Sequence, residues 1–324
     1  MHLTRCLLVL AINAATAIVL CTAPAIAETW PQRPVRIVVP VGAGGGPDLT
    51  ARLFAERLAQ RWKQPVVVEN RPGADGLTGV SGFAGMRDDH VLLFFAAAPI
   101  SSFPVIYHKL PYDPRDLVPI ASATDTFLTV AASASLDIRS LAELVALARA
   151  RPGSLNYNPV AGALPYVFAG FLKGAGLDMV LVPYREYSLA AHDLAEGHIQ
   201  VMISTMTLVL PQARAGKVRL LAVTNSKRAP IAPEVPTATE AGYPDLAFEG
   251  LLGFFGPRDM SSALRDRISA DIRAVASDPA IADRLAAVGQ IARGSTGAEF
   301  AAAIEPQRAQ IASIVQSVGL KPMQ

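Results

Sequence analysis

Cysteine is almost absent from this sequence of 324 residues. The two cysteines, Cys6 and Cys21, both lie in the first 27 residues, so residues 28–324 contain none. This part of the chain can therefore form no disulfide, and it has no thiol for nucleophilic catalysis. Its stability must come from a hydrophobic core, which a chain of this length can bury and usually divides between two domains.

Charge is sparse and unclustered. The chain has 29 Lys and Arg against 27 Asp and Glu, and without Arg5 the balance is 28 to 27, a net charge of +1. No cluster of basic residues indicates a surface for nucleic acid or for anionic membrane, so neither is expected as a partner. Beyond the N-terminal region no run of roughly 18 apolar residues occurs, and we expect a soluble mature chain.

The usual catalytic sets are also missing. Around Ser81 the sequence "GVSGF" has Phe83 where a nucleophile elbow needs glycine. His192 and His198 are six positions apart, which predicts opposite faces of a helix and no shared metal ion. His90 precedes an apolar run that we expect to form a strand stopping at Pro99, and it is interpreted as a residue at the start of this strand. The sequence indicates neither an enzyme, a metal site nor a cofactor.

The first 27 residues have the layout of a secretory signal peptide. Arg5 is followed by a long apolar region and by the small residues Ala25–Ala27. Two alternatives are a transmembrane anchor, because the apolar run is long, and a lipoprotein signal with Cys21 as the lipidated residue. Pro24 and the A-x-A pattern favour cleavage, and Leu20 stands where a lipoprotein signal has a small residue. We therefore expect export to the periplasm.

Glycine, in contrast, is concentrated after the first predicted strand. The run Ile37–Val39 stops at Pro40, and four glycines then occupy five positions, Gly42 to Gly46, before Pro47. This pattern predicts a strand, a glycine loop and a helix with Pro47 in its first turn. Backbone N–H groups at such a helix N-terminus form a site for an anion.

The two common nucleotide-binding templates do not fit this loop. A dinucleotide fingerprint needs glycine at position 47, which is proline, and a P-loop needs a lysine, of which there is none between Arg36 and Lys63. The loop therefore predicts a backbone pocket for a small anion such as a carboxylate. The alternative is a tight turn without a ligand, since glycine often serves only to allow positive φ.

Predicted strands and helices alternate along the chain, which is typical of an α/β fold. The clearest helix runs from Ser140 to Gly153, with Ser140 as its cap and Glu143 completing a capping box. Extended segments near Ala123 and Leu251 predict two crossings between lobes. One lobe would contain residues 28–123 and 251–324 and the other residues 124–250, with a ligand enclosed in the cleft between them.

Several stretches resemble the periplasmic receptors of tripartite tricarboxylate transporters, often called Bug receptors. They include "WPQRPVRIVVPVGAGGGPDLTARLFAERL", "QPVVVENRPGADGLTG", "YHKLPYDPRDLVPIA" and "ARAGKVRLLAVTNSKRAP", and they occur in the family's order. The resemblance implies a two-lobed periplasmic binding protein of type II-like fold, two mixed α/β domains joined by two crossing strands. Such a receptor binds a small organic carboxylate and delivers it to membrane carrier subunits; we expect a monomer.

Two other classes of function are alternatives to this interpretation. A sensory receptor that signals to a membrane histidine kinase, without transport, would have the same fold. An exported hydrolase is disfavoured by the missing catalytic set.

The resemblance also implies a binding site, made by the loops after the first three strands and by loops of the second lobe. In the first loop Asp48 matches the family's acid, and backbone N–H groups with bound waters would receive one carboxylate. The complete set of implied ligand-binding residues is Val41, Gly42, Ala43, Gly44, Gly45, Asp48, Asp75, Ala97, Ala98, Val160, Ala161, Tyr184, Ser204 and Thr205.

The chain departs from the family in the second lobe. After "LNY" the family has hydroxyl-bearing residues, whereas this chain has Pro159, Val160, Ala161 and Leu164, and Ser204 replaces a common aspartate. Fewer hydroxyls would hold a second carboxylate less well and would accept a ring or an alkyl chain better. These departures predict a monocarboxylate or an aromatic carboxylate, unless the replaced residues pack in the core without touching ligand.

Asp75 and Glu186 are acidic where the family often has glycine. Asp75 lies at a predicted helix start, where an acid usually acts as a cap or as a partner of the helix dipole. The alternative is that its carboxylate meets an ammonium group on the ligand.

Overall fold

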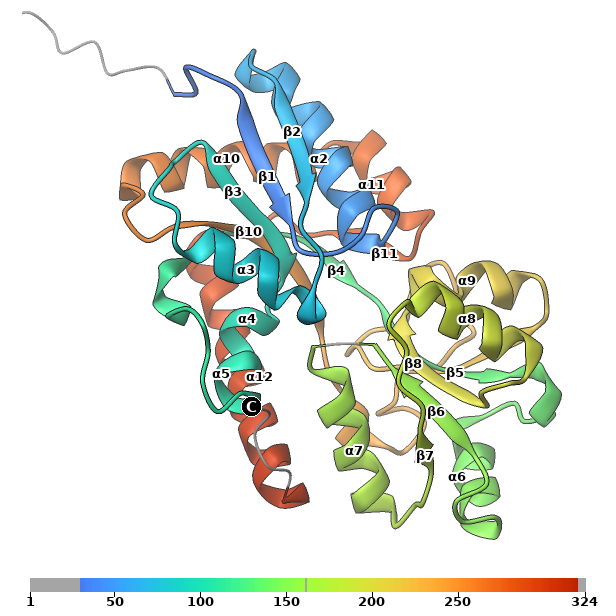
Figure 1. Ribbon diagram of the computed structural model, residues 1–324. Helices are drawn as coiled ribbons and strands as arrows, with labels where there is room; N and C mark the ends of the chain where they lie inside the picture. The colour runs from blue at the N-terminus through green and yellow to red at the C-terminus, as the bar shows by residue number, and fades with distance from the viewer. Residues whose placement is uncertain (1–29, 161, 320–324) are drawn as a thin grey trace, which may run out of the picture. The chain divides into compact units, whose positions relative to one another are not determined.

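The computed structural model describes residues 30–160 and 162–319 (Figure 1). The predicted signal peptide, residues 1–27, and the predicted site residue Ala161 lie outside the described residues. Two β-sheets, each with its own helices, form a mixed α/β structure, as predicted. No helix among the described residues combines the length and the apolarity that a bilayer span requires.

The first sheet has six strands in the order β11-β4-β10-β3-β1-β2. Strands β1, β2 and β3 are mutually parallel, whereas β10 runs antiparallel to both of its neighbours, β3 and β4. β3 is apolar along its whole length and its first five residues are buried, as expected for a strand in the middle of a sheet covered on both faces. The strands are β1 (Val35–Val39), β2 (Val66–Asn70), β3 (Val91–Ala96), β4 (Leu117–Thr126), β10 (Gly250–Pro257) and β11 (Gln290–Ala292).

This sheet and the helices that follow its strands are called the first lobe. Those helices are α2 (Gly46–Trp62), α3 (Leu77–Ala84), α4 (Ala98–Ser101), α5 (Phe103–Ile106), α10 (Ser262–Ala276), α11 (Pro279–Ala286) and α12 (Gly297–Val318). Their inward faces carry aromatic side chains: Phe54 of α2 contacts Phe254 of β10 with ring centroids 5.6 Å apart, and Phe300 of α12 contacts Phe255 at 5.2 Å. Aromatic pairs at this spacing contribute beyond their buried area.

The second sheet has five strands in the order β7-β6-β8-β5-β9, and with α6 to α9 it is called the second lobe. Strands β6, β7 and β8 are mutually parallel, and β5 is antiparallel to β8 and β9. Its strands are β5 (Leu128–Ser133), β6 (Asn156–Pro159), β7 (Val180–Leu181), β8 (Val201–Thr205) and β9 (Val218–Val223). Its helices are α6 (Leu141–Ala150), α7 (Leu164–Ala175), α8 (Tyr187–Glu196) and α9 (Met206–Arg214).

The chain passes from the first sheet to the second at Phe127, between β4 and β5, and it returns at Gly250, where β10 begins. Gly250 lies opposite Thr126 in the antiparallel pair of β10 and β4. The later half of α12 also reaches the second lobe, because Ile311 belongs to the same buried cluster as Phe168 and Phe171 of α7. The lobe boundaries predicted from the sequence stay a prediction.

Three local predictions were wrong. The third strand ends at Ala96, and Pro99 lies in the first turn of α4 instead of ending the strand. Ser140 caps α6, since its Oγ accepts from the Glu143 N–H at 3.2 Å, but Glu143 accepts from the N–H of Arg139, so the capping box is not closed. His198 lies beyond α8, which ends at Glu196, so the two histidines do not share a helix.

Candidate functional site

The parallel strands of each lobe end in loops that lead directly into helices. In the first lobe, β1, β2 and β3 are followed by α2, α3 and α4; in the second, β6, β7 and β8 are followed by α7, α8 and α9. Because parallel strands end at the same edge of a sheet, each lobe gathers three loops at one edge. Ligands of open α/β sheets bind outside the carboxyl ends of the strands, so these two edges are the candidate site.

Contacts between the two sets of loops show that they face each other. The Tyr187 hydroxyl of α8 donates to Asp75 Oδ1, in the loop before α3, at 3.1 Å. A Cβ built on Gly162, before α7, would lie 3.7 Å from the Cβ of Ala98. A Cβ built on Gly46, at the start of α2, would lie 4.0 Å from Thr207 Oγ1 of α9. Each loop of the first lobe is thus paired with one of the second.

The glycine loop is shaped by backbone geometry that favours glycine. Gly44 has φ of +83°, and Gly45 is the N-cap of α2 with Pro47 in the first turn, as predicted. The Gly44 N–H donates to Asp48 Oδ2 at 2.8 Å. Within the described part of the chain, the N–H groups of Gly42, Ala43 and Gly45 donate to no protein acceptor. Donors at the positive end of a 17-residue helix are suited to an anion.

Asp48 holds this loop in place. Its side chain is 2 % exposed and accepts from Asn70 Nδ2 at 2.9 Å and from Arg52 Nε at 3.1 Å, in addition to Gly44. Burial raises the pKa of Asp48, but the hydrogen bonds from Arg52, Gly44 and Asn70 outweigh burial, and the net pKa lies below its ordinary value. The charged carboxylate is therefore already satisfied by the protein, and its role is to order the loop.

Three polar residues that the sequence analysis missed surround the start of α2. Gln290 of β11 is 1 % exposed, and its Oε1 lies 2.7 Å from the Thr50 Oγ1. Its Nε2 finds no acceptor among the described residues and lies 3.5 Å from a Cβ built on Gly46. Thr207 donates to Val288 O at 2.6 Å, which ties α9 to the segment before β11. Gln290 is about 240 positions from the loop, so no local pattern could have indicated it.

The structure overturns the expectation that Asp75 caps a helix. The N-cap of α3 is Gly76, without a side-chain cap, and Asp75 lies in the short 3-10 turn Ala74–Gly76 with φ of +54°. Its carboxylate is exposed and accepts from Tyr187 across the two lobes.

The remaining predicted residues divide into two groups. Ala98 lies at the contact between the two lobes, opposite Gly162. Val160 is half-buried in the loop that contains Gly162, and Thr205 is the half-buried N-cap of α9. Ala97 and Ser204 are buried, and the Ser204 Oγ donates to the Thr205 carbonyl at 3.1 Å. Val41, Gly42 and Ala43 form the partly open rim of the glycine loop.

Leu164 was predicted to replace a ligand-binding hydroxyl, but it is 3 % exposed and belongs to the buried cluster of the second lobe. At this position the alternative of core packing is correct.

The hydroxyl of Tyr184 already has a hydrogen-bond partner in its own lobe. Its hydroxyl donates to Asp193 Oδ2 of α8 at 2.6 Å. Burial and this hydrogen bond raise the pKa of Tyr184 to about 12. Its predicted contact with ligand therefore stays a prediction that would require the hydroxyl to leave Asp193.

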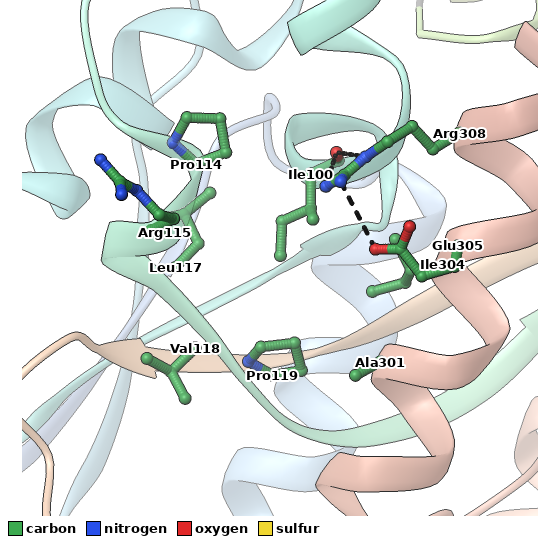
Figure 2. Close-up of a pocket in the computed structure, with 10 residues that line it drawn as sticks. All are labelled: Ile100, Pro114, Arg115, Leu117, Val118, Pro119, Ala301, Ile304, Glu305 and Arg308. Carbon is green, nitrogen blue, oxygen red and sulfur yellow. Dashed lines mark hydrogen bonds and ion pairs between the residues drawn. The ribbon is translucent and has the colours of Figure 1, made fainter. Parts of the chain in front are cut away.

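A separate cavity of about 310 Å³ lies in the first lobe, between α12 and the start of β4 (Figure 2). Its two arginines are already partnered. Arg308 Nη2 donates to the Ile100 carbonyl at 3.0 Å and pairs with Glu305, and Arg115 pairs with Asp113 at 2.6 Å. Neither arginine of this cavity is therefore free to pair with the carboxylate of a ligand. In the glycine loop, by contrast, three N–H groups have no protein acceptor within the described residues.

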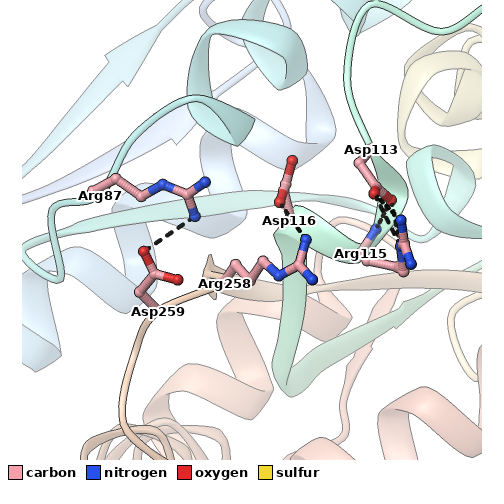
Figure 3. Close-up of polar contacts among 6 residues, drawn as sticks. All are labelled: Arg87, Asp113, Arg115, Asp116, Arg258 and Asp259. Atoms are coloured by element: carbon pink, nitrogen blue, oxygen red, sulfur yellow. Dashed lines mark hydrogen bonds and ion pairs between the residues drawn. The ribbon is translucent and has the colours of Figure 1, made fainter.

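The surface nearby carries three Arg–Asp pairs, shown in Figure 3. They join Arg87 to Asp259 at 3.2 Å, Arg258 to Asp116 at 3.5 Å and Arg115 to Asp113. Hydrogen bonds from the Arg115 side chain and backbone lower the pKa of Asp113 to about 2. Exposed pairs contribute little to stability, and here they leave the surface electrically balanced.

One group of residues in the described chain has metal-ligand types within reach of one another: Asp88, Asp89 and His90. Asp88 pairs with Arg33 at 2.6 Å, and His90 Nδ1 lies 2.6 Å from Asp89 Oδ1. These partners account for the cluster as a structural feature at the start of β3.

Comparisons with known proteins agree with this geometry. The family model described as "Tripartite tricarboxylate transporter family receptor" matches residues 50–320. Protein BugT of Bordetella pertussis is 30% identical over 326 residues, covering 99% of both chains. A solved R. palustris protein with adipate is 27% identical, with a TM-score of 0.85, covering 91% of this chain and 100% of the other. The periplasmic binding protein BugD is 26% identical, with a TM-score of 0.81, covering 90% and 99%.

Proposed function

Because this chain belongs to the tripartite tricarboxylate transporter receptor family, we propose that it binds a small organic carboxylate between its two lobes and delivers it to a membrane carrier. The observation that carries this proposal is the glycine loop, where the N–H groups of Gly42, Ala43 and Gly45 have no protein acceptor within the described chain. The internal carboxylate of Asp48 orders the loop without using these donors. An external carboxylate is the group that would complete it.

The second lobe supports the enclosure of this ligand. Thr207, Gly162 and Tyr187 lie at the starts of three helices of the second lobe, and each is in contact with a loop of the first. A ligand held between these loops would be removed from bulk water on both sides, which strengthens the hydrogen bonds to its carboxylate.

We expect the ligand to carry one carboxylate rather than three. Val160 is apolar, half-buried and beside the site, whereas Ser204 is fully buried and donates to a carbonyl of its own strand. A tricarboxylate would leave charges without partners, each costing several kcal/mol when buried. An alkyl chain would gain up to about 0.8 kcal/mol for each CH₂ removed from water.

Calorimetric titration of the mature protein with benzoate, hexanoate and citrate tests the proposal. At least one monocarboxylate should bind tenfold or more tightly than citrate. Tighter binding of citrate would contradict the expected preference, and no binding of any organic acid would contradict the carboxylate receptor itself.

Delivery to a carrier, and export of the chain to the periplasm, rest on family membership and on the signal-like first 27 residues. Uptake of a bound acid by vesicles that contain the carrier subunits should require the loaded receptor. Equal uptake with and without the receptor would contradict the proposed delivery to a carrier, but not the proposed binding of the acid.

A further inference from the structure

The loop before α3 holds an unusual backbone conformation. Four successive residues have positive φ: Gly73 at +137°, Ala74 at +45°, Asp75 at +54° and Gly76 at +93°. Residues other than glycine are strained in this region, although aspartate adopts it more readily than most. Strain of this kind is concentrated at ligand-binding loops. The strained residues here are the ones that present the Asp75 carboxylate to the second lobe.

Asp75 has no positively charged partner in the part of the chain that the structure describes. It forms no ion pair there, and its protein hydrogen bond comes from the neutral Tyr187 hydroxyl at 3.1 Å. Two acids of the first lobe differ in this respect, since Asp48 pairs with Arg52 and Asp88 pairs with Arg33. An unbalanced carboxylate held at the meeting of two lobes attracts a cation.

One tyrosine hydrogen-bonds to this carboxylate, and two more lie close enough to feel its charge. Tyr187 begins α8, Tyr107 follows α5 and Tyr166 lies in α7, so the three come from separate elements. Burial first, and then the negative charge of Asp75, raises the pKa of Tyr107. Burial, Tyr107 and Asp75 raise the pKa of Tyr166 to about 12. Tyr107 and Tyr166 therefore stay neutral, and neutral aromatic rings attract a cation.

We propose that Asp75, with Tyr187 opposite it across the two lobes, binds a positively charged nitrogen of the ligand. The inference rests on the proposed function, because the same ligand would place its carboxylate on the glycine loop. A carboxylate pairs with an ammonium group, and aromatic faces attract it further. A second carboxylate at this end of the ligand would instead be repelled by Asp75.

Three acids with the same six-carbon chain separate these possibilities. Hexanoate ends in a methyl group, adipate in a carboxylate and 6-aminohexanoate in an ammonium group. The wild-type protein should bind 6-aminohexanoate about tenfold more tightly than hexanoate, and adipate most weakly. In Asp75→Asn the preference for the amino acid should fall to within about twofold, and adipate should gain affinity.

Asparagine is the suitable replacement because it also tolerates the left-handed backbone that this position requires. Asp259→Asn is the matched control, since it removes one exposed acid from the first lobe at the surface pair with Arg87. This control should leave the order of the three acids unchanged, which excludes an effect of net charge alone. Melting temperatures of both variants report whether they are folded.

The outcomes separate this inference from the proposed function. Equal binding of hexanoate and 6-aminohexanoate by the wild type, or a tenfold preference that persists in Asp75→Asn, would overturn the assignment of Asp75 and leave a carboxylate receptor. If neither these acids nor benzoate binds, the proposed function fails and the inference fails with it.

Discussion

Gly250→Ala should lower the free energy of unfolding by more than about 3 kcal/mol, the upper end of the usual overpacking range. A Cβ at this position would lie 2.2 Å from the Thr126 carbonyl oxygen and 3.2 Å from Leu128 Cγ. The first obstacle is backbone of β4, which cannot rotate away as a side chain can. The substitution would thus separate β10 from β4 where the chain returns to the first lobe.

Chemical denaturation of this variant checks the prediction, with Gly82→Ala as the matched control. Gly82 lies in α3, and a Cβ there would meet only the Arg71 Nη1, at 3.6 Å. Replacing a helical glycine by alanine should stabilise the protein by up to about 1 kcal/mol. An unfolding midpoint of Gly250→Ala equal to that of wild type would show that the two strands separate without cost.

Gly44→Val should reduce the affinity for a carboxylate at least a hundredfold, about 2.7 kcal/mol, while the protein stays folded. No atom lies within 4 Å of a Cβ at Gly44, so the new side chain meets no obstacle in the fold. A β-branched residue is a strong outlier at φ of +83°, however, and the loop must leave this conformation. The Gly44 N–H would then lose Asp48, and the N–H groups of its neighbours would be displaced.

Gly42→Ala is the control for this effect. A Cβ at Gly42 also meets no atom within 4 Å, and this residue does not have positive φ. Its affinity should stay within a few-fold of wild type. If Gly44→Val binds the carboxylate as tightly as wild type in calorimetry, the glycine loop is not part of the binding site.

The sequence predicted local features that depend on neighbouring residues. The glycine loop followed by Pro47 at a helix start is one, because glycine and proline each restrict the backbone in a known way. The "AAAPIS" segment was predicted wrongly because a short apolar run fits both a strand and a buried helix, and Pro99 is compatible with a first helical turn. Glu143 was predicted to close a capping box, but the Arg139 N–H is its partner.

The candidate site depends more on contacts between distant residues. Gln290 lies near Gly46, and Tyr187 contacts Asp75, although each comes from a distant element of the chain. No spacing in the sequence indicates either contact. The sequence predicted a cap at Asp75 because acids commonly precede helices, whereas its backbone is left-handed and its carboxylate faces the other lobe. Leu164 stands at a position that contacts ligand in the family, yet its side chain packs in the buried core.

Amide chemical shifts followed during titration with hexanoate test the central claim most directly, namely that a carboxylate binds at the facing strand ends of the two lobes. The account predicts the largest shifts at Gly42, Ala43 and Gly45, together with shifts near Thr207 in the opposite lobe. Shifts confined to the cavity around Arg115 and Arg308, with the glycine loop unchanged, would contradict it.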